Sequence, residues 1–81
     1  MDIERFQLID QNDISQIENH LKLGKILFIE TSKFFAKFKN DIPTLQQTIQ
    51  RIHSVSSQIG GSIGRVGPDV LVVTPNGWVE I

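Results

Sequence analysis

The fold is decided by the sequence Gly60-Gly61-Ser62-Ile63-Gly64-Arg65-Val66-Gly67-Pro68-Asp69-Val70-Leu71-Val72-Val73-Thr74-Pro75. Residues 62–66 and 70–73 have the pattern of short strands, and the Gly67-Pro68-Asp69 turn between them is typical of a β-hairpin. Gly64 lies inside the first strand, where glycine marks either close backbone packing or contact with a partner. The stretch therefore predicts two adjacent antiparallel strands.

A long amphipathic helix is expected immediately before this hairpin. Asp41 is a suitable N-cap, Pro43 is tolerated in a first helical turn, and Gly60-Gly61 ends the helix. Between these signals, apolar residues recur at spacings of four and three, which is the period of one helix face. These apolar residues are Leu45, Ile49, Ile52, Val55 and Ile59.

A shorter helix is expected closer to the N-terminus. Asp13 followed three residues later by Gln16 is a capping-box pattern, which predicts a helix start at Asp13. Gly24 is placed to end this helix in a left-handed conformation. The apolar stripe of the helix consists of Ile14, Ile17 and Leu21.

Strands and a connector complete the pattern. Residues 6–9 alternate like a short strand, and residues 25–31 form a compact apolar run that needs cover on both faces. Residues 32–40 are interpreted as a connector. Residues 78–81, Trp78-Val79-Glu80-Ile81, have the composition of a further edge strand. The element order is therefore β-α-β-α-β-β, with a fifth strand at the C-terminal end.

This order predicts an α/β (α+β) two-layer sandwich, with residues 1–81 forming a single domain. Right-handed crossovers place both helices on one face of a four- to five-stranded mixed sheet. The strands at 25–31 and 70–73 are apolar on both faces, so the face without helices also needs a cover. An exposed apolar face of that size is an association site, and a second copy of the chain is the simplest cover. We therefore expect a homodimer.

The composition argues against several classes of protein. Eight basic and nine acidic residues give a formal net charge of −1, whereas a duplex-binding module needs several Lys and Arg side chains on one face. The chain has no cysteine, which excludes disulfides and thiolate metal sites. No apolar run approaches the roughly 20 residues of a membrane span, and residues 1–5 do not resemble a signal peptide. We expect a cytoplasmic protein with no metal and no cofactor.

No catalytic site is expected. The serines show no G-x-S-x-G elbow. His20 and His53 lie in separate segments, and a histidine beside an apolar helical stripe is more often a solvated residue than a catalytic one. The acidic residues are scattered at turns and helix starts, where capping explains several of them. The sequence therefore indicates a binding protein rather than an enzyme.

The connector contains three phenylalanines that alternate with lysines: Phe34, Phe35 and Phe38 among Lys33, Lys37 and Lys39. Aromatic residues among lysines can bind single-stranded nucleic acid or lie on a membrane surface. Alternatively, the phenylalanines cover the edge of the sheet while the lysines remain in water. In a chain this short, the second interpretation is favoured.

The stretch from Gly60 to Pro75 resembles the signature of the SepF family of cell-division proteins. That signature is a GG-x-I-x-[RK]-[VI]-G strand followed by an apolar strand that ends in Thr-Pro or Ser-Pro, here Thr74-Pro75. The upstream order of strand, helix, strand and long helix is also similar. The absence of a bacterial-type C-terminal extension resembles the archaeal branch.

The resemblance implies a non-enzymatic adaptor. Family members are dimers of α/β sandwich domains that bind the C-terminal tail peptide of the tubulin-like protein FtsZ at the division site, on the inner face of the membrane. They reach the membrane through a separate N-terminal amphipathic helix, which residues 1–5 do not supply. This chain is accordingly expected to form a homodimer, to assemble further through its dimers, and to help anchor FtsZ.

The resemblance also assigns residues. By motif position, Arg65 matches the basic residue of the tail-binding pocket and Leu71 its apolar, often aromatic, residue, so leucine here is a departure. The grooves beside the two hairpin strands would add contacts from Ile63, Val66 and Val73. Gly61 matches a glycine important for higher assembly, and Gly64 is a second candidate for an assembly or dimer contact.

The sequence is also compatible with two other functions. Alba-type chromatin proteins and the C-terminal domain of a bacterial translation initiation factor share the β-α-β-α-β-β order, so a nucleic-acid-binding module is the alternative function. Such domains carry a basic stripe, and this chain has no lysine or arginine between Arg51 and Arg65 and none after Arg65. No nucleic acid is therefore expected as a partner. A small dimeric ligand-sensing domain is the third reading.

Overall fold

A computed structural model describes residues 3–75 of the chain. The strands are β1 (Ile3–Gln7), β2 (Ile26–Glu30), β3 (Ser62–Val66) and β4 (Val70–Thr74). The helices are α1 (Ile14–Lys22), α2 (Ser32–Lys37) and α3 (Ile42–Gln58). A short 3-10 helix, η1 (Gln11–Asp13), precedes α1. This confirms the α+β class and the β-α-β-α-β-β order, with α2 as an added helix. The expected strand at 78–81 lies outside the described residues.

The four described strands form one mixed sheet in the order β1-β2-β4-β3. β1 pairs with β2 in parallel, and β4 is antiparallel to both of its neighbours, β2 and β3. The hairpin strand β4 is thus inserted between β2 and β3. Its central place explains why residues 70–73 are apolar on both faces, while β3 at the edge is polar and glycine-containing.

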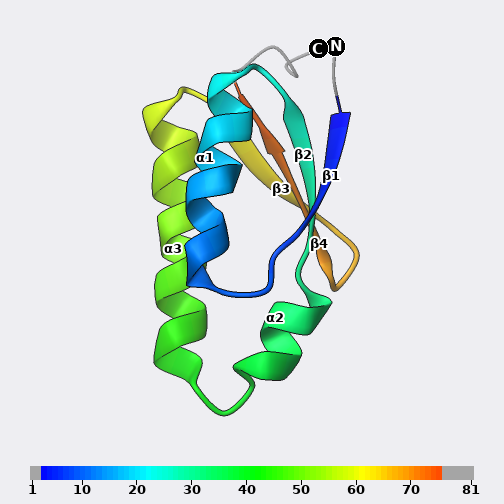
Figure 1. Ribbon diagram of the computed structural model, residues 1–81, viewed down its shortest axis with the longest axis vertical. Coiled ribbons are helices and arrows are strands. Elements are labelled where there is room, and N and C mark those ends of the chain that lie inside the picture. Colours follow the sequence, from blue (N-terminus) through cyan, green and yellow to red (C-terminus); the bar gives the residue numbers. More distant parts are fainter. Residues whose placement is uncertain (1–2, 76–81) are drawn as a thin grey trace.

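All three helices lie on one side of the sheet (Figure 1). α1 and α3 pack next to each other along the strands, and α2 lies at one end of the sheet. The core between the helices and the sheet is made by buried side chains from both layers: Leu8, Ile14, Ile17, Leu21, Leu27, Ile29, Phe34, Ile52, Val55 and Val73. The predicted stripe of α1 is confirmed, because all three of its residues are buried.

The opposite side of the sheet, here called the open face, carries no helix within residues 3–75 (Figure 1). Since side chains alternate along a strand, the register that points Leu27 and Val73 into the core points Phe28 and Val72 outward. Both outward residues are only half-buried. Val66, on the same face of β3, is 56% exposed.

The phenylalanine-rich connector is a helix, which corrects the sequence interpretation. Phe34 and Phe38, four residues apart, are on one face of α2 and its C-terminal end, and their ring centroids are 5.0 Å apart. Phe34 is fully buried, whereas Lys33, Lys37 and Lys39 are exposed. The interpretation that these aromatic residues pack while the lysines stay in water is confirmed.

The predicted start of α1 is confirmed, with Asp13 at its N-cap position, but the bounds of β1 and the residues of the capping box were predicted wrongly. β1 begins at Ile3 and ends at Gln7, because its parallel pairing with β2 starts at Ile3 opposite Ile26. The capping box is formed by Asp10 and Asp13, not by Asp13 and Gln16. The Asp10 carboxylate accepts from the Asn12 N–H at 2.8 Å, and Asp13 Oδ2 accepts from the Asp10 N–H at 3.2 Å. The box therefore starts η1, one turn earlier than expected.

The predicted ends of α3 are confirmed. Asp41 is its N-cap, accepting from the Thr44 N–H at 3.3 Å and from the Thr44 hydroxyl at 2.6 Å. At the other end, Gly60 has φ +78°, a left-handed conformation that glycine adopts without strain. The Gly61 N–H donates to the Ser56 carbonyl at 2.9 Å, which closes the last turn. This end directs the chain straight into β3.

Candidate functional site

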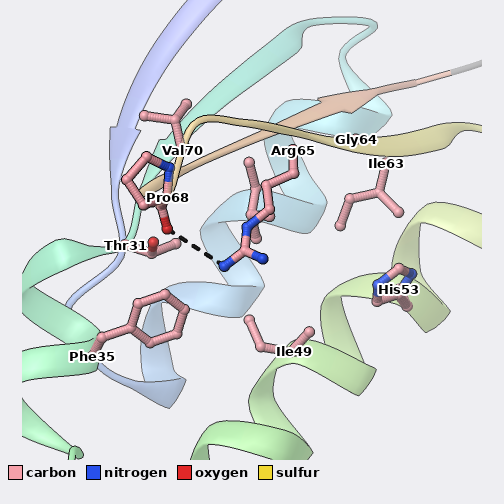
Figure 2. Close-up of a pocket in the computed structure, with 10 residues that line it drawn as sticks. Thr31, Phe35, Ile49, His53, Ile63, Gly64, Arg65, Pro68 and Val70 are labelled. Carbon is pink, nitrogen blue, oxygen red and sulfur yellow. Dashed lines mark hydrogen bonds between the residues drawn. The ribbon is translucent and has the colours of Figure 1, made fainter.

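A cavity of about 310 Å³ lies between the β3–β4 hairpin and the helices α2 and α3 (Figure 2). Thr31 closes it at the end of β2, and Pro68 closes it at the hairpin turn. The described residues that line it are mostly apolar, and none of them is acidic: Thr31, Phe35, Ile49, His53, Ile63, Gly64, Arg65, Pro68, Val70 and Leu71. We call this the hairpin cavity.

Arg65 supplies the positive charge of the hairpin cavity. Strand alternation places Ile63 and Arg65 on the helix side of β3, and Arg65 is paired across the ladder with Leu71. The guanidinium extends from β3 into the space in front of Phe35 and Ile49 (Figure 2). Its Nη2 lies 3.5 Å from the Pro68 carbonyl oxygen, a long hydrogen bond. Within residues 3–75, no carboxylate pairs with Arg65. The guanidinium therefore retains donors for a ligand.

The hairpin turn is tied to the start of α2 by one residue. Thr31 donates twice to the Asp69 carbonyl, from its backbone N–H and from its hydroxyl, each at 2.8 Å. Thr31 is 1% exposed and Asp69 is exposed, so these two bonds are partly shielded from water. Gly67 has φ +68° and makes the turn itself. The double contact holds the hairpin turn against the start of α2, the helix that carries Phe35.

Three of the five residues expected to bind the tail line this one cavity. Ile63, Arg65 and Leu71 come together there. Val73 does not, because it is 0% exposed in the core beneath the helices. Val66 does not either, because it follows Arg65 in the strand and points to the open face, where it is 56% exposed. Instead of grooves beside both strands, the structure has one cavity, on the helix side of β3 and β4.

The two glycines expected to make assembly contacts have different surroundings. A Cβ atom added to Gly61 would collide with the backbone carbonyl of Thr74, so the chain itself requires glycine there. A Cβ atom added to Gly64 would meet nothing within 4 Å. Gly64 belongs to the open face of β3, opposite Val72 of β4. Only Gly64 lies on a surface that is free within the described residues.

Other lining residues were not identified as functional from the sequence. Ile49 was placed on the apolar stripe of α3, and Phe35 was placed in a connector, although a phenylalanine beside the Phe34–Phe38 pair signals a helix against the core. His53 reaches the cavity from α3 (Figure 2). His20 lies on α1, packed against Phe6 with ring centroids 5.9 Å apart. The two histidines thus belong to different parts of the helical layer.

In residues 3–75, none of the helices has the length and the apolar character that crossing a bilayer requires. The longest helix in this part of the chain, α3, carries polar side chains on the side that faces water, among them Gln46 and Gln50.

Comparisons with known proteins identify a family and similar folds. Residues 3–80 match the family model described as cell division protein SepF. Among solved structures, a SepF-like protein from Archaeoglobus fulgidus superposes with a TM-score of 0.81 at 21% identity, covering 95% of this chain and 88% of that protein. A SepF-like protein from Pyrococcus furiosus gives a TM-score of 0.72 at 20% identity, with coverage of 90% and 84%. No curated protein sequence matches.

The structural likenesses establish the fold, and both similar structures are archaeal. The family model spans nearly all of the sequence, including the hairpin that carries the glycine and arginine motif. The chain belongs to the SepF family of cell division proteins.

Proposed function

We propose that this protein is a division adaptor that holds the C-terminal tail of FtsZ in the hairpin cavity. The observation that carries the proposal is that Ile63, Arg65 and Leu71, drawn from two strands, line a single, mostly apolar cavity, and that the Arg65 guanidinium has no ion-pair partner among the described residues. A short peptide would bury apolar side chains there and offer Arg65 a carboxylate or a carbonyl oxygen. Such a charge-assisted contact gives more affinity than a neutral hydrogen bond.

The proposal includes a homodimer formed through the open face. Phe28 and Val72 are apolar and half-buried on a face that no described helix covers. Packing two such faces would remove this apolar surface from water, at about 25 cal/mol per Å². A dimer would carry two hairpin cavities. Because an FtsZ filament presents many tails, two weak sites would give a higher effective affinity.

Family membership supports a place of action at the division site. We propose that the dimer helps to anchor FtsZ to the inner face of the membrane, with the membrane contact made outside the domain described by residues 3–75. The domain itself then contributes peptide binding and dimerisation, with no catalytic step.

Calorimetric titration of a synthetic FtsZ tail peptide tests the proposal. Arg65→Ala is expected to weaken binding about tenfold or more, since a hydrogen bond to a charged group contributes about 1.5–3 kcal/mol. Arg51→Ala is the matched control, because Arg51 is exposed on α3 and does not line the cavity. Equal binding by both variants would exclude Arg65 from the site. No binding by the unmodified protein would exclude the proposed function.

A further inference from the structure

β3 is the edge strand of the described sheet. It pairs with β4 on one side, and within residues 3–75 no strand pairs with its other side. In an antiparallel ladder, alternate backbone N–H and C=O groups of an edge strand point away from the partner strand. Four of the five β3 residues are exposed, so water reaches this edge. Within the part of the chain that the structure describes, the outer edge of β3 therefore has backbone donors and acceptors that an incoming chain can bind.

The hairpin cavity lies on the helix side of this same edge. Ile63 and Arg65 form its strand wall, and Ile49 and His53 of α3 form the wall opposite (Figure 2). A strand added beside β3 would direct every second side chain toward α3 and the others toward the open face. Edge pairing combined with pockets for alternate side chains is a general mode of peptide recognition.

The charges indicate what the added strand must carry. Among residues 3–75, no acidic side chain lines the cavity, and Arg65 projects into it without an ion-pair partner. An inward-pointing charge at a free edge disfavours strands that bring no counter-charge. The site thus selects a segment with an acidic side chain for Arg65 and, two residues away on the same face, an apolar side chain for the wall formed by Phe35 and Ile49.

We infer that the ligand of the hairpin cavity binds as an extended strand added to β3, an inference that rests on the proposed function and specifies its binding mode. A second copy of the chain is a poorer occupant of this edge. Antiparallel pairing of two β3 edges about Gly64 would bring both Arg65 side chains to the same face of the joint sheet, where like charges repel. The open face remains the place for the second copy.

A methylation scan of the peptide backbone tests the inference. A series of synthetic FtsZ tail peptides, each with one N-methylated amide at successive positions, is titrated against the full chain. Amides that face β3 lose about tenfold in affinity, and amides between them lose less than about twofold, because only the former give up a hydrogen bond. Since every peptide carries one methyl group, the alternation itself is the signature of an added strand.

The outcomes separate the two claims. Binding of the unmodified peptide without alternation in the scan overturns the added strand and leaves the proposed function in place. Failure of the unmodified peptide to bind overturns the proposed function, and the inference with it. Amide hydrogen exchange is a second test. The backbone amides within 63–66 that point away from β4 should exchange quickly in the free protein and slowly in the complex. Slow exchange in the free protein would show that the edge is already covered, which overturns the inference.

Discussion

Gly61 and Gly64 differ in what surrounds them, although they lie three residues apart in one motif. Space for a side chain is missing at Gly61, which packs against the Thr74 carbonyl, and present at Gly64. Gly61→Ala should lower the melting temperature by about 10 °C, because forcing a methyl group into a filled site costs about 1–3 kcal/mol. Thermal unfolding followed by circular dichroism gives the measurement.

Gly64→Ala is the control for this change. It adds the same methyl group in the same segment where the chain itself has nothing within 4 Å, so at a protein concentration too low for dimers the melting temperature should shift by less than about 3 °C. Equal losses in the two variants would contradict the close approach of Gly61 to Thr74.

At the level of residues, the strand motif predicted part of the site. Arg65 and Ile63 share a face because they are two positions apart, and the cross-strand pairing of Arg65 with Leu71 follows from the hairpin. The same alternation places Val66 on the opposite face. Val73 was not separable from Leu71 by pattern, since both face the helices. Only the packing of the helices decides that Val73 is covered and Leu71 reaches the cavity.

Among the elements, the hairpin and α2 are connected through Thr31. Thr31→Val removes the hydroxyl that donates to the Asp69 carbonyl at 2.8 Å and leaves the backbone donor in place. The free energy of unfolding should fall by about 1 kcal/mol, as measured by urea denaturation. Binding of the FtsZ tail peptide should weaken as well, because the hairpin is less firmly held at the mouth of the cavity.

Thr31→Ser retains the hydroxyl and is the control for Thr31→Val. It should keep most of the stability and of the peptide affinity. If the valine variant matched the unmodified protein in both measurements, the hydrogen bonds of Thr31 would not be what fixes the hairpin against α2.

The elements were predictable where capping and periodicity agreed. α3 combined an N-cap at Asp41, a continuous apolar stripe and terminal glycines, so both of its ends were located correctly. α2 was missed because a six-residue helix shows less than two turns of periodicity, and alternating lysines hide its apolar side. The capping box was misplaced because Asp10 and Asp13 both fit the pattern, and only the hydrogen bonds distinguish them.

At the scale of the whole molecule, the order of strands in the sheet determines which residues meet. The sequence predicts a hairpin but not that β4 inserts between β2 and β3, because an edge position would satisfy the same hairpin. The central position of β4 places Leu71 beneath the helices and Val72 on the open face. The apolar residues on both faces of β4 indicated that both faces are covered, but not which strands lie beside it.

The proposed dimer makes a prediction at the same scale. Val72→Glu places a charge in the middle of the open face, where desolvating it between two sheets would be costly. Sedimentation equilibrium should show a dimer for the unmodified protein and a monomer for the variant. Leu23→Glu, at a 73% exposed position after α1, should leave the dimer intact. A monomeric unmodified protein would contradict the dimer.

The most direct test of the central claim is to map the FtsZ tail peptide onto the protein by nuclear magnetic resonance. The isotope-labelled chain is titrated with unlabelled peptide, and the backbone amide shifts are followed residue by residue. If the peptide binds in the hairpin cavity, the largest changes are expected around it, at Thr31, Phe35, Ile49, Ile63 and Arg65. Changes centred on Phe28 and Val72 of the open face, or no changes at all, would contradict this claim.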